Sequence, residues 1–154
     1  MKTNATRALE LQGIEHSVFT FEVGEEHKSA VDVARSLKIN PDRLFKTLVC
    51  SDLDSLIFVY VIPGSCELDL KKAADPAGVK RLRLVPVSEL QDITGYVRGG
   101  CSPIGMKKQY PTYVDESATL YERIVVSAGI RGAQLSLSPA DLIRITSATT
   151  SDLT

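Results

Sequence analysis

Histidine, cysteine and long apolar runs are all scarce in this chain of 154 residues. The two histidines, His16 and His27, do not form a His-x-x-x-His pair, so a zinc site is not expected. The three cysteines, Cys50, Cys66 and Cys101, are odd in number and widely spaced, which argues against a disulfide framework and a Cys-x-x-Cys metal site. We therefore expect reduced thiols, no metal and no cofactor.

The sequence also lacks a membrane segment and an excess of positive charge. Its longest apolar run, residues 56–63, is far shorter than the roughly 20 residues that span a bilayer, and residues 1–7 lead into no apolar signal segment. Lys plus Arg is 18 and Asp plus Glu is 19, for a net charge of −1. A broad nucleic-acid surface usually carries surplus Lys and Arg. We expect a cytoplasmic protein with no membrane contact, whose contact with nucleic acid, if any, is local.

Three common active-site motifs are absent as well. The chain has no Gly-x-Ser-x-Gly nucleophile elbow, no Gly-x-x-x-x-Gly-Lys-Ser/Thr phosphate loop and no Gly-x-Gly-x-x-Gly dinucleotide turn. A Cys–His pair is possible from the residues present, but their spacing does not favour one.

What is present is typical of one globular α/β domain spanning residues 1–154. Apolar residues make up 44% and charged residues 24%, and the length suits a single core. Apolar periodicity, caps and turn residues predict helices at residues 4–12, 29–38, 69–76, 88–92 and from 138. They predict strands at residues 17–23, 44–50, 56–62, 80–85, 112–114, 123–127 and 133–137. Strands that cluster in hairpins favour a mixed, mostly antiparallel sheet flanked by short helices, with a frayed tail after Thr146.

Lys46 is the first candidate for chemistry. It lies within an otherwise apolar strand, between Phe45 and Thr47. One interpretation is a solvent-facing lysine whose stem covers apolar surface. The other is a positive charge held on a rigid strand at a cleft, where it can meet a phosphate or a developing oxyanion.

Two glycine-rich segments are the other candidates. Residues 95–105 read Gly-Tyr-Val-Arg-Gly-Gly-Cys-Ser-Pro-Ile-Gly, and residues 126–132 read Val-Ser-Ala-Gly-Ile-Arg-Gly. Successive N–H groups in such turns can bind an anion. Tight turns without any ligand have the same composition, so both interpretations stay open at this point.

Taken together, these blocks resemble the YbaK/EbsC family. The resemblance rests on Phe-Lys-Thr-Leu-Val at residues 45–49, the segments at 95–105 and 126–132, and Tyr-Val-Asp at 113–115, and it runs over nearly the whole chain. That family hydrolyses misacylated tRNA and has a curved sheet, and the N-terminal helix and strand are most similar to its Cys-tRNA(Pro) deacylases. The same fold occurs as an editing insertion in some prolyl-tRNA synthetases.

The resemblance implies a set of site residues. Lys46 would be the central functional residue with Thr47 beside it, and Gly99, Gly100, Ser127 and Gly129 would line the pocket. Two positions depart from the family pattern: Phe21 stands where several relatives have Tyr, and Gln134 stands where some have an acidic residue. Each change can alter the strength or selectivity of substrate binding.

The resemblance also implies a reaction and its partners. The substrate would be the aminoacyl ester at the 3′ end of tRNA, cleaved by attack of the substrate cysteine's own thiol, with prolyl-tRNA synthetase supplying tRNA selectivity. Two alternatives stay open. One is a non-catalytic module that binds the tRNA 3′ end or a nucleotide, and the other is a deacylase for alanine or serine.

Overall fold

The computed structural model describes residues 1–26 and 28–154, and His27 lies outside the described residues. Its helices and strands are short, as predicted. The helices are α1 (Asn4–Leu11), α2 (Ala30–Leu37), α3 (Leu70–Ala77), α4 (Val87–Thr94) and α5 (Pro139–Thr146), with 3-10 turns at Pro41–Arg43 and Glu116–Leu120. The strands are β1 (Ser17–Thr20), β2 (Phe45–Ser51), β3 (Ile57–Pro63), β4 (Arg83–Leu84), β5 (Thr112–Asp115), β6 (Ile124–Ser127), β7 (Ala133–Leu137) and β8 (Thr149–Ser151).

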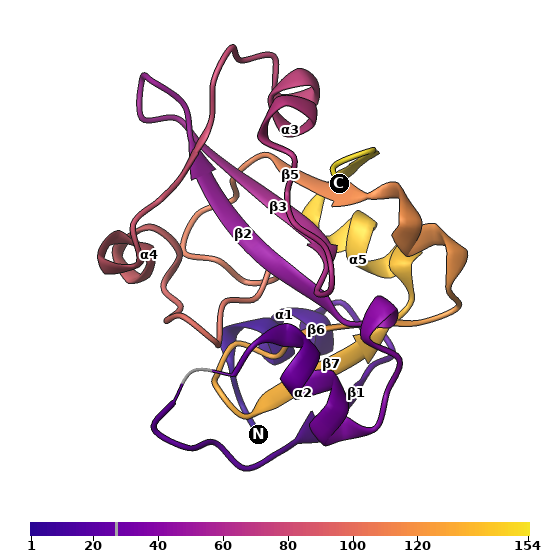
Figure 1. Ribbon diagram of the computed structural model, residues 1–154. Helices are drawn as coiled ribbons and strands as arrows, with labels where there is room; N and C mark the ends of the chain where they lie inside the picture. The colour runs from indigo at the N-terminus through magenta and orange to yellow at the C-terminus, as the bar shows by residue number, and fades with distance from the viewer. Residues whose placement is uncertain (27) are drawn as a thin grey trace.

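The strands form two sheets rather than one. The larger has the order β4-β2-β3-β5-β8, with parallel pairing at β3–β5 and β5–β8, and the smaller is antiparallel with the order β1-β7-β6. A bridge between Leu44 and Val125 joins the two. Figure 1 shows the long β2–β3 pair running between β1, β6 and β7 at one end and α3 at the other. The predicted α/β class with a mixed, mostly antiparallel arrangement and short helices is confirmed.

Both faces of the large sheet are covered. On one face, Phe45 of β2 and Val61 of β3 pack in the main core with residues of α1, α5 and the small sheet. On the other face, Cys50 and Tyr60 pack beneath Ala73 of α3. The alternation of side chains along a strand thus divides β2 between two cores.

Helix ends follow the sequence signals. The Ser29 side chain caps α2 by accepting from the Asp32 N–H, and Asp32 accepts from the Ser29 N–H in return. The Asp69 carboxylate caps α3 in the same way, accepting from the N–H groups of Lys71 and Lys72. Each cap satisfies donors that the first turn of a helix leaves free.

The C-terminal tail was predicted wrongly. It is not frayed: Thr149–Ser151 forms β8 beside β5, and Leu153 is fully buried. The Asp69 N–H donates to the Leu153 carbonyl at 2.8 Å, and the Leu153 N–H donates to Asp115 at 2.9 Å. The polar composition of this segment did not predict a strand, because the strand is stabilised by these distant partners.

Other boundaries differ less. The predicted strands at residues 17–23 and 80–85 shrink to Ser17–Thr20 and Arg83–Leu84, and Pro76 lies inside the last turn of α3 rather than ending it. None of the described helices is long and apolar enough to cross a membrane.

The edge of β2 that faces away from β3 positions the site. Within the described residues, β4 pairs with β2 at Cys50 and Ser51, the small sheet is bridged to this part of the chain at Leu44, and no strand pairs with the stretch between. The Val49 carbonyl on this edge accepts from the Val85 N–H at 3.0 Å. Since N–H and C=O directions alternate along an antiparallel strand, Thr47 also directs both of its backbone groups to this open edge.

Candidate functional site

A cavity of about 520 Å³ lies along the open edge of β2. Six consecutive residues, 44–49, border it, which is why side chains from both faces of the strand contribute. The start of α2, the segment from β4 into α4, and the two glycine-rich segments supply the other walls. The lining residues outside β2 include Lys28, Ser29, Ala30, Val33, Gly64, Leu84, Val85, Val87, Leu90, Arg98, Gly99, Cys101, Ser127 and Gln134.

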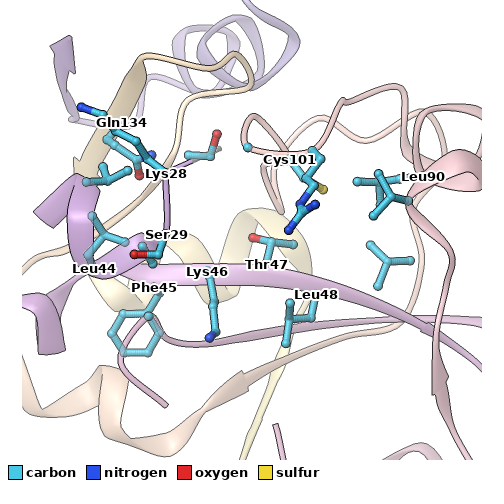
Figure 2. Close-up of a pocket in the computed structure, with 18 of the residues that line it drawn as sticks. Lys28, Ser29, Leu44, Phe45, Lys46, Thr47, Leu48, Leu90, Cys101 and Gln134 are labelled. Carbon is cyan, nitrogen blue, oxygen red and sulfur yellow. The ribbon is translucent and has the colours of Figure 1, made fainter. Parts of the chain in front are cut away.

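The two ends of the cavity differ in character. Figure 2 shows Lys28, Ser29 and Gln134 toward one end, and Leu90 and Cys101 toward the other. Lys46 and Thr47 lie between these ends, and their side chains extend to opposite sides of β2. A ligand that fills the cavity therefore passes this part of the strand.

Lys46 is half-buried and free of protein partners. Within the described residues its ammonium makes no ion pair and donates no hydrogen bond, whereas Lys72, for comparison, pairs with Asp152 at 3.0 Å. A half-buried cation with no neutralising carboxylate attracts an anion from solution more strongly than an exposed, screened one.

The charged groups that line the cavity all have one sign. They are Lys28, Lys46 and Arg98, and no Asp or Glu of the described residues borders the cavity, although the chain as a whole carries a net charge of −1. The Lys28 ammonium lies 5.6 Å from the centroid of the Phe21 ring, a distance at which a cation is attracted to an aromatic face. This concentration of positive charge suits an anionic ligand.

Three polar side chains in the lining can make further bonds. Among the described residues, the Thr47 hydroxyl and the Gln134 Oε1 are buried without a hydrogen-bond partner, and Ser127 accepts only from the Gly129 N–H, at 3.2 Å. A buried polar atom without a partner costs stability unless a ligand or water supplies the bond. These residues fit a ligand that carries its own donors.

Four of the seven residues singled out from the sequence border the cavity: Lys46, Thr47, Gly99 and Ser127. Phe21 does not; it follows β1 and borders a small adjoining hollow with Val23 and Arg131. Gly100 and Gly129 do not border the cavity either.

Gly100 and Gly129 instead allow close packing beside the cavity. A Cβ on Gly100 would lie 2.9 Å from the backbone of Ile130 and Arg131, so the two glycine-rich segments touch here. Gly129 has φ +103°, a conformation that favours glycine, and a Cβ there would lie 2.9 Å from the Tyr96 ring. Both glycines hold the cavity wall in shape.

The start of α1 supports the same wall. The Thr3 hydroxyl donates to the Ala128 carbonyl at 2.6 Å, and a Cβ on Gly105 would lie 2.7 Å from the Asn4 carbonyl. The Arg131 guanidinium adds a link by donating to the carbonyls of Gly24 and Glu26. Segments far apart in sequence are thereby fixed around one opening.

The thiols near the site are not activated. Cys101 borders the cavity, and burial raises the pKa of its thiol to about 12. Burial also raises the pKa of Cys50 to about 12, in the core beneath α3. A thiol with so high a pKa is protonated near pH 7 and is a poor nucleophile.

No group of three or more His, Cys, Asp and Glu side chains in the described chain is arranged to hold a metal ion. The side chains that border the cavity also include no histidine among the described residues. What the described residues of the cavity offer is orientation, positive charge and hydrogen-bonding groups.

Sequence reasoning missed the wall formed by β4 and α4. Leu84, Val87 and Leu90 come from two short elements, and nothing in their spacing placed them beside β2. Arg98 lies in the glycine-rich segment 95–105, which was a candidate, but it was not singled out within that segment. Gln134 was noted as a departure from the family pattern but not as a lining residue.

Known proteins similar in sequence to this chain identify its family. The profile of the aminoacyl-tRNA editing domain matches residues 24–145. Over 153 residues the chain is 46% identical to the "Putative Cys-tRNA(Pro)/Cys-tRNA(Cys) deacylase EbsC" of Enterococcus faecalis, a match that covers 99% of this chain and 93% of that protein. It is 29% identical over 117 residues to a proline–tRNA ligase of Shouchella clausii, covering 76% of this chain and 20% of the ligase.

Solved structures extend the likeness to three dimensions. A crystal structure described as a "putative trans-editing enzyme for prolyl tRNA synthetase" has a TM-score of 0.82 and 26% identity, covering 99% of this chain and 98% of the other. Together with the family profile and the E. faecalis relative, this confirms the resemblance drawn from residues 45–49, 95–105 and 126–132. The chain belongs to the family of aminoacyl-tRNA editing domains, in its YbaK/EbsC branch.

Proposed function

We propose that this protein is a deacylase that cleaves Cys-tRNA(Pro), and that residues 1–154 act as one editing domain. The observation that carries the proposal is the cavity itself: among the described residues every charged group in its lining is a cation, and Lys46, at its middle, makes no ion pair. The 3′ end of tRNA brings phosphates and an ester carbonyl, and both are stabilised by such groups. The name of the E. faecalis relative supports the choice of substrate.

The substrate supplies the nucleophile in this mechanism. The cysteine thiol of the aminoacyl group attacks its own carbonyl carbon, forming a C–S bond and a tetrahedral oxyanion. The C–O bond to the terminal ribose then breaks, the thiol proton ends on the ribose oxygen, and a thiolactone leaves for hydrolysis in water. No protein base or nucleophile is required, which fits the protonated state that burial imposes on Cys101.

The protein contributes orientation and charge. Holding the thiol and carbonyl in an attacking geometry removes much of the entropic cost of the reaction. Lys46 stabilises the oxyanion or the 3′-terminal phosphate, and the Thr47 N–H on the open edge of β2 and the N–H groups near Gly99 are further donors. Gln134 and Ser127 accept from the α-amino group of the aminoacyl moiety.

A non-catalytic module that binds the tRNA 3′ end is the second candidate. Phe21 lacks the hydroxyl that several relatives have at this position, and this departure favours it. A deacylase for alanine or serine is the third, and it would need an activated water because the thiolactone route is closed to those substrates. In all three cases we place the protein in the cytoplasm with prolyl-tRNA synthetase as its partner, in line with the ligase relative.

Deacylation of tRNA(Pro) charged with Cys, Ala or Ser tests these alternatives directly. We expect the pure protein to release cysteine at least tenfold faster than alanine or serine, because neither of those substrates carries the thiol that attacks the carbonyl carbon. Binding without release of any amino acid would support the module, and faster release of alanine or serine would support the third candidate. The first result would exclude Cys-tRNA(Pro) deacylation, and the second would overturn cysteine as the preferred amino acid.

A further inference from the structure

The wall between β4 and α4 is apolar and open to solvent. Leu84 and Val87 both border the cavity, yet their side chains are 52% and 57% exposed. Half-buried Leu48 and Leu90 continue the same surface. Apolar side chains that line a cavity and remain exposed are typical of a surface that a ligand covers.

This wall is fixed in place by β2. Leu84 pairs with Cys50, and the Val85 N–H donates to the Val49 carbonyl at 3.0 Å. Val87 then begins α4 directly after Pro86. The apolar groups are therefore presented by short elements anchored to the strand that carries Lys46.

The wall lies about one nucleoside length from Lys46. From Lys46 to Val49 the strand rises by about 10 Å, and Leu84 lies beside the next residue, Cys50. Figure 2 shows Leu90 and Cys101 on this side of Lys46 and Thr47, opposite Gln134 and Lys28. With an ester at Lys46, a nucleoside extends into the apolar end and an aminoacyl group into the polar end.

A positive charge at the rim of the cavity also fits a nucleoside that carries a phosphate. Arg98 is exposed and borders the cavity, where a phosphate attached to the nucleoside can meet it. Because the wall is open to solvent, the rest of an RNA chain has room to leave.

Resting on the proposed function, we infer that Leu84, Val87 and Leu90 form a subsite for the base of the 3′-terminal nucleoside of tRNA, with Arg98 binding its phosphate. The base lies flat against the aliphatic side chains, which cover its apolar face without reading its edges. This subsite sets the position of the ester relative to Lys46.

The test asks whether the terminal base of tRNA and the apolar wall contribute to binding through the same contact. tRNA(Pro) ending in the normal adenosine is compared with the same tRNA whose terminal ribose lacks its base, both uncharged for binding and both charged with cysteine for deacylation. The variant is Leu84→Ser with Val87→Ser, chosen because both side chains are largely exposed and their loss leaves the core intact. Leu120→Ser, at a leucine that is 79% exposed and does not border the cavity, is the matched control.

We expect the variant to bind normal tRNA about tenfold more weakly, the loss that about 55 Å² of uncovered apolar surface produces. Removing the base should weaken binding to the parent protein by a similar factor, with little further loss when both changes are combined. Equal losses for the variant on both tRNAs, or no loss on normal tRNA, would refute the subsite.

The two readouts separate this inference from the proposed function. If the effects of removing the base and of changing the wall on binding are not additive, but no cysteine is released, the subsite is upheld and the deacylase is overturned. If the parent protein releases cysteine and the two effects on binding are additive, the deacylase is upheld and the subsite is overturned. The control should match the parent in both measurements, and a loss there equal to that of the variant would count against the subsite.

Discussion

Replacing Lys46 by alanine should abolish most deacylation while leaving the protein folded. The ammonium is half-buried and has no ion pair among the described residues, so its charge is available to the substrate. A unit charge about 4 Å from a developing oxyanion contributes about 4 kcal/mol at an effective dielectric of about 20, similar to the effect of removing one oxyanion-hole donor. The rate should therefore fall by about 100-fold to 1000-fold.

Stability should change little, because Lys46→Ala breaks no hydrogen bond and leaves no cavity in the core. We expect a loss below about 1 kcal/mol, or less than about 4 °C in Tm. Lys71→Ala, at an exposed lysine on α3 that does not border the cavity, is the matched change of charge. The assay is single-turnover release of cysteine from charged tRNA(Pro), with a thermal melt of each variant.

The variant Lys46→Arg distinguishes two roles for the charge of Lys46: binding a phosphate or stabilising the ester carbonyl. Arginine keeps the charge but replaces a compact ammonium with a wide planar fork. If Lys46 binds a phosphate, the variant should retain part of the activity; if the ammonium fits beside the carbonyl, it should be nearly as slow as Lys46→Ala. Full activity of Lys46→Ala would refute the assignment and leave Lys46 as a lysine whose stem covers apolar surface.

Three further predictions concern the thiols and the tRNA contact. A triple variant with Cys50, Cys66 and Cys101 all replaced by alanine should still release cysteine, and a folded triple variant without activity would indicate a protein nucleophile instead. Binding of tRNA without the synthetase should weaken with salt at a log–log slope of about −0.7 per phosphate contacted, and a slope steeper than about −5 would reveal a broad basic surface. Because burial raises the pKa of Cys50 and Cys101 from an ordinary value of 9.0 to about 12, their neutral form favours the folded state. That stability is complete below pH 9 and falls as the pH rises from 9 toward 12, by about 1.4 kcal/mol per pH unit and thiol. Urea unfolding across this range should show the loss, and Cys50→Ala should reduce its pH dependence.

Local signals in the sequence predicted much of the fold. The capping box at Ser29 and Asp32, the cap at Asp69 and the apolar runs of β2 and β3 depend on residues near one another in the chain, and the structure has each of them. The prediction for the C-terminal tail was wrong because the structure of the tail depends on residues far away in the chain. Thr149–Ser151 is polar and short, and it is a strand only because β5 pairs with it and Asp69 and Asp115 bond to Leu153.

The candidate site divides in the same way. Lys46 stood out because a charge within an apolar strand conflicts with its neighbours, and the glycine-rich segments stood out by composition; the family resemblance then linked these blocks. No local pattern in the sequence could predict which glycines border the cavity. Gly99 does, whereas Gly100 and Gly129 are in contact with Ile130 and Tyr96.

The sequence by itself determined the family, the short helices and strands, and the presence of an unusual lysine, because each of these is written in a few adjacent residues. Only the tertiary structure decided that β2 has an open edge, that the cavity along it carries charge of one sign, and that Leu84 and Val87 form one of its walls. These properties arise where β2, β4, α4 and two glycine-rich segments meet, and contacts between residues so far apart in the chain leave no periodic signal in any one segment.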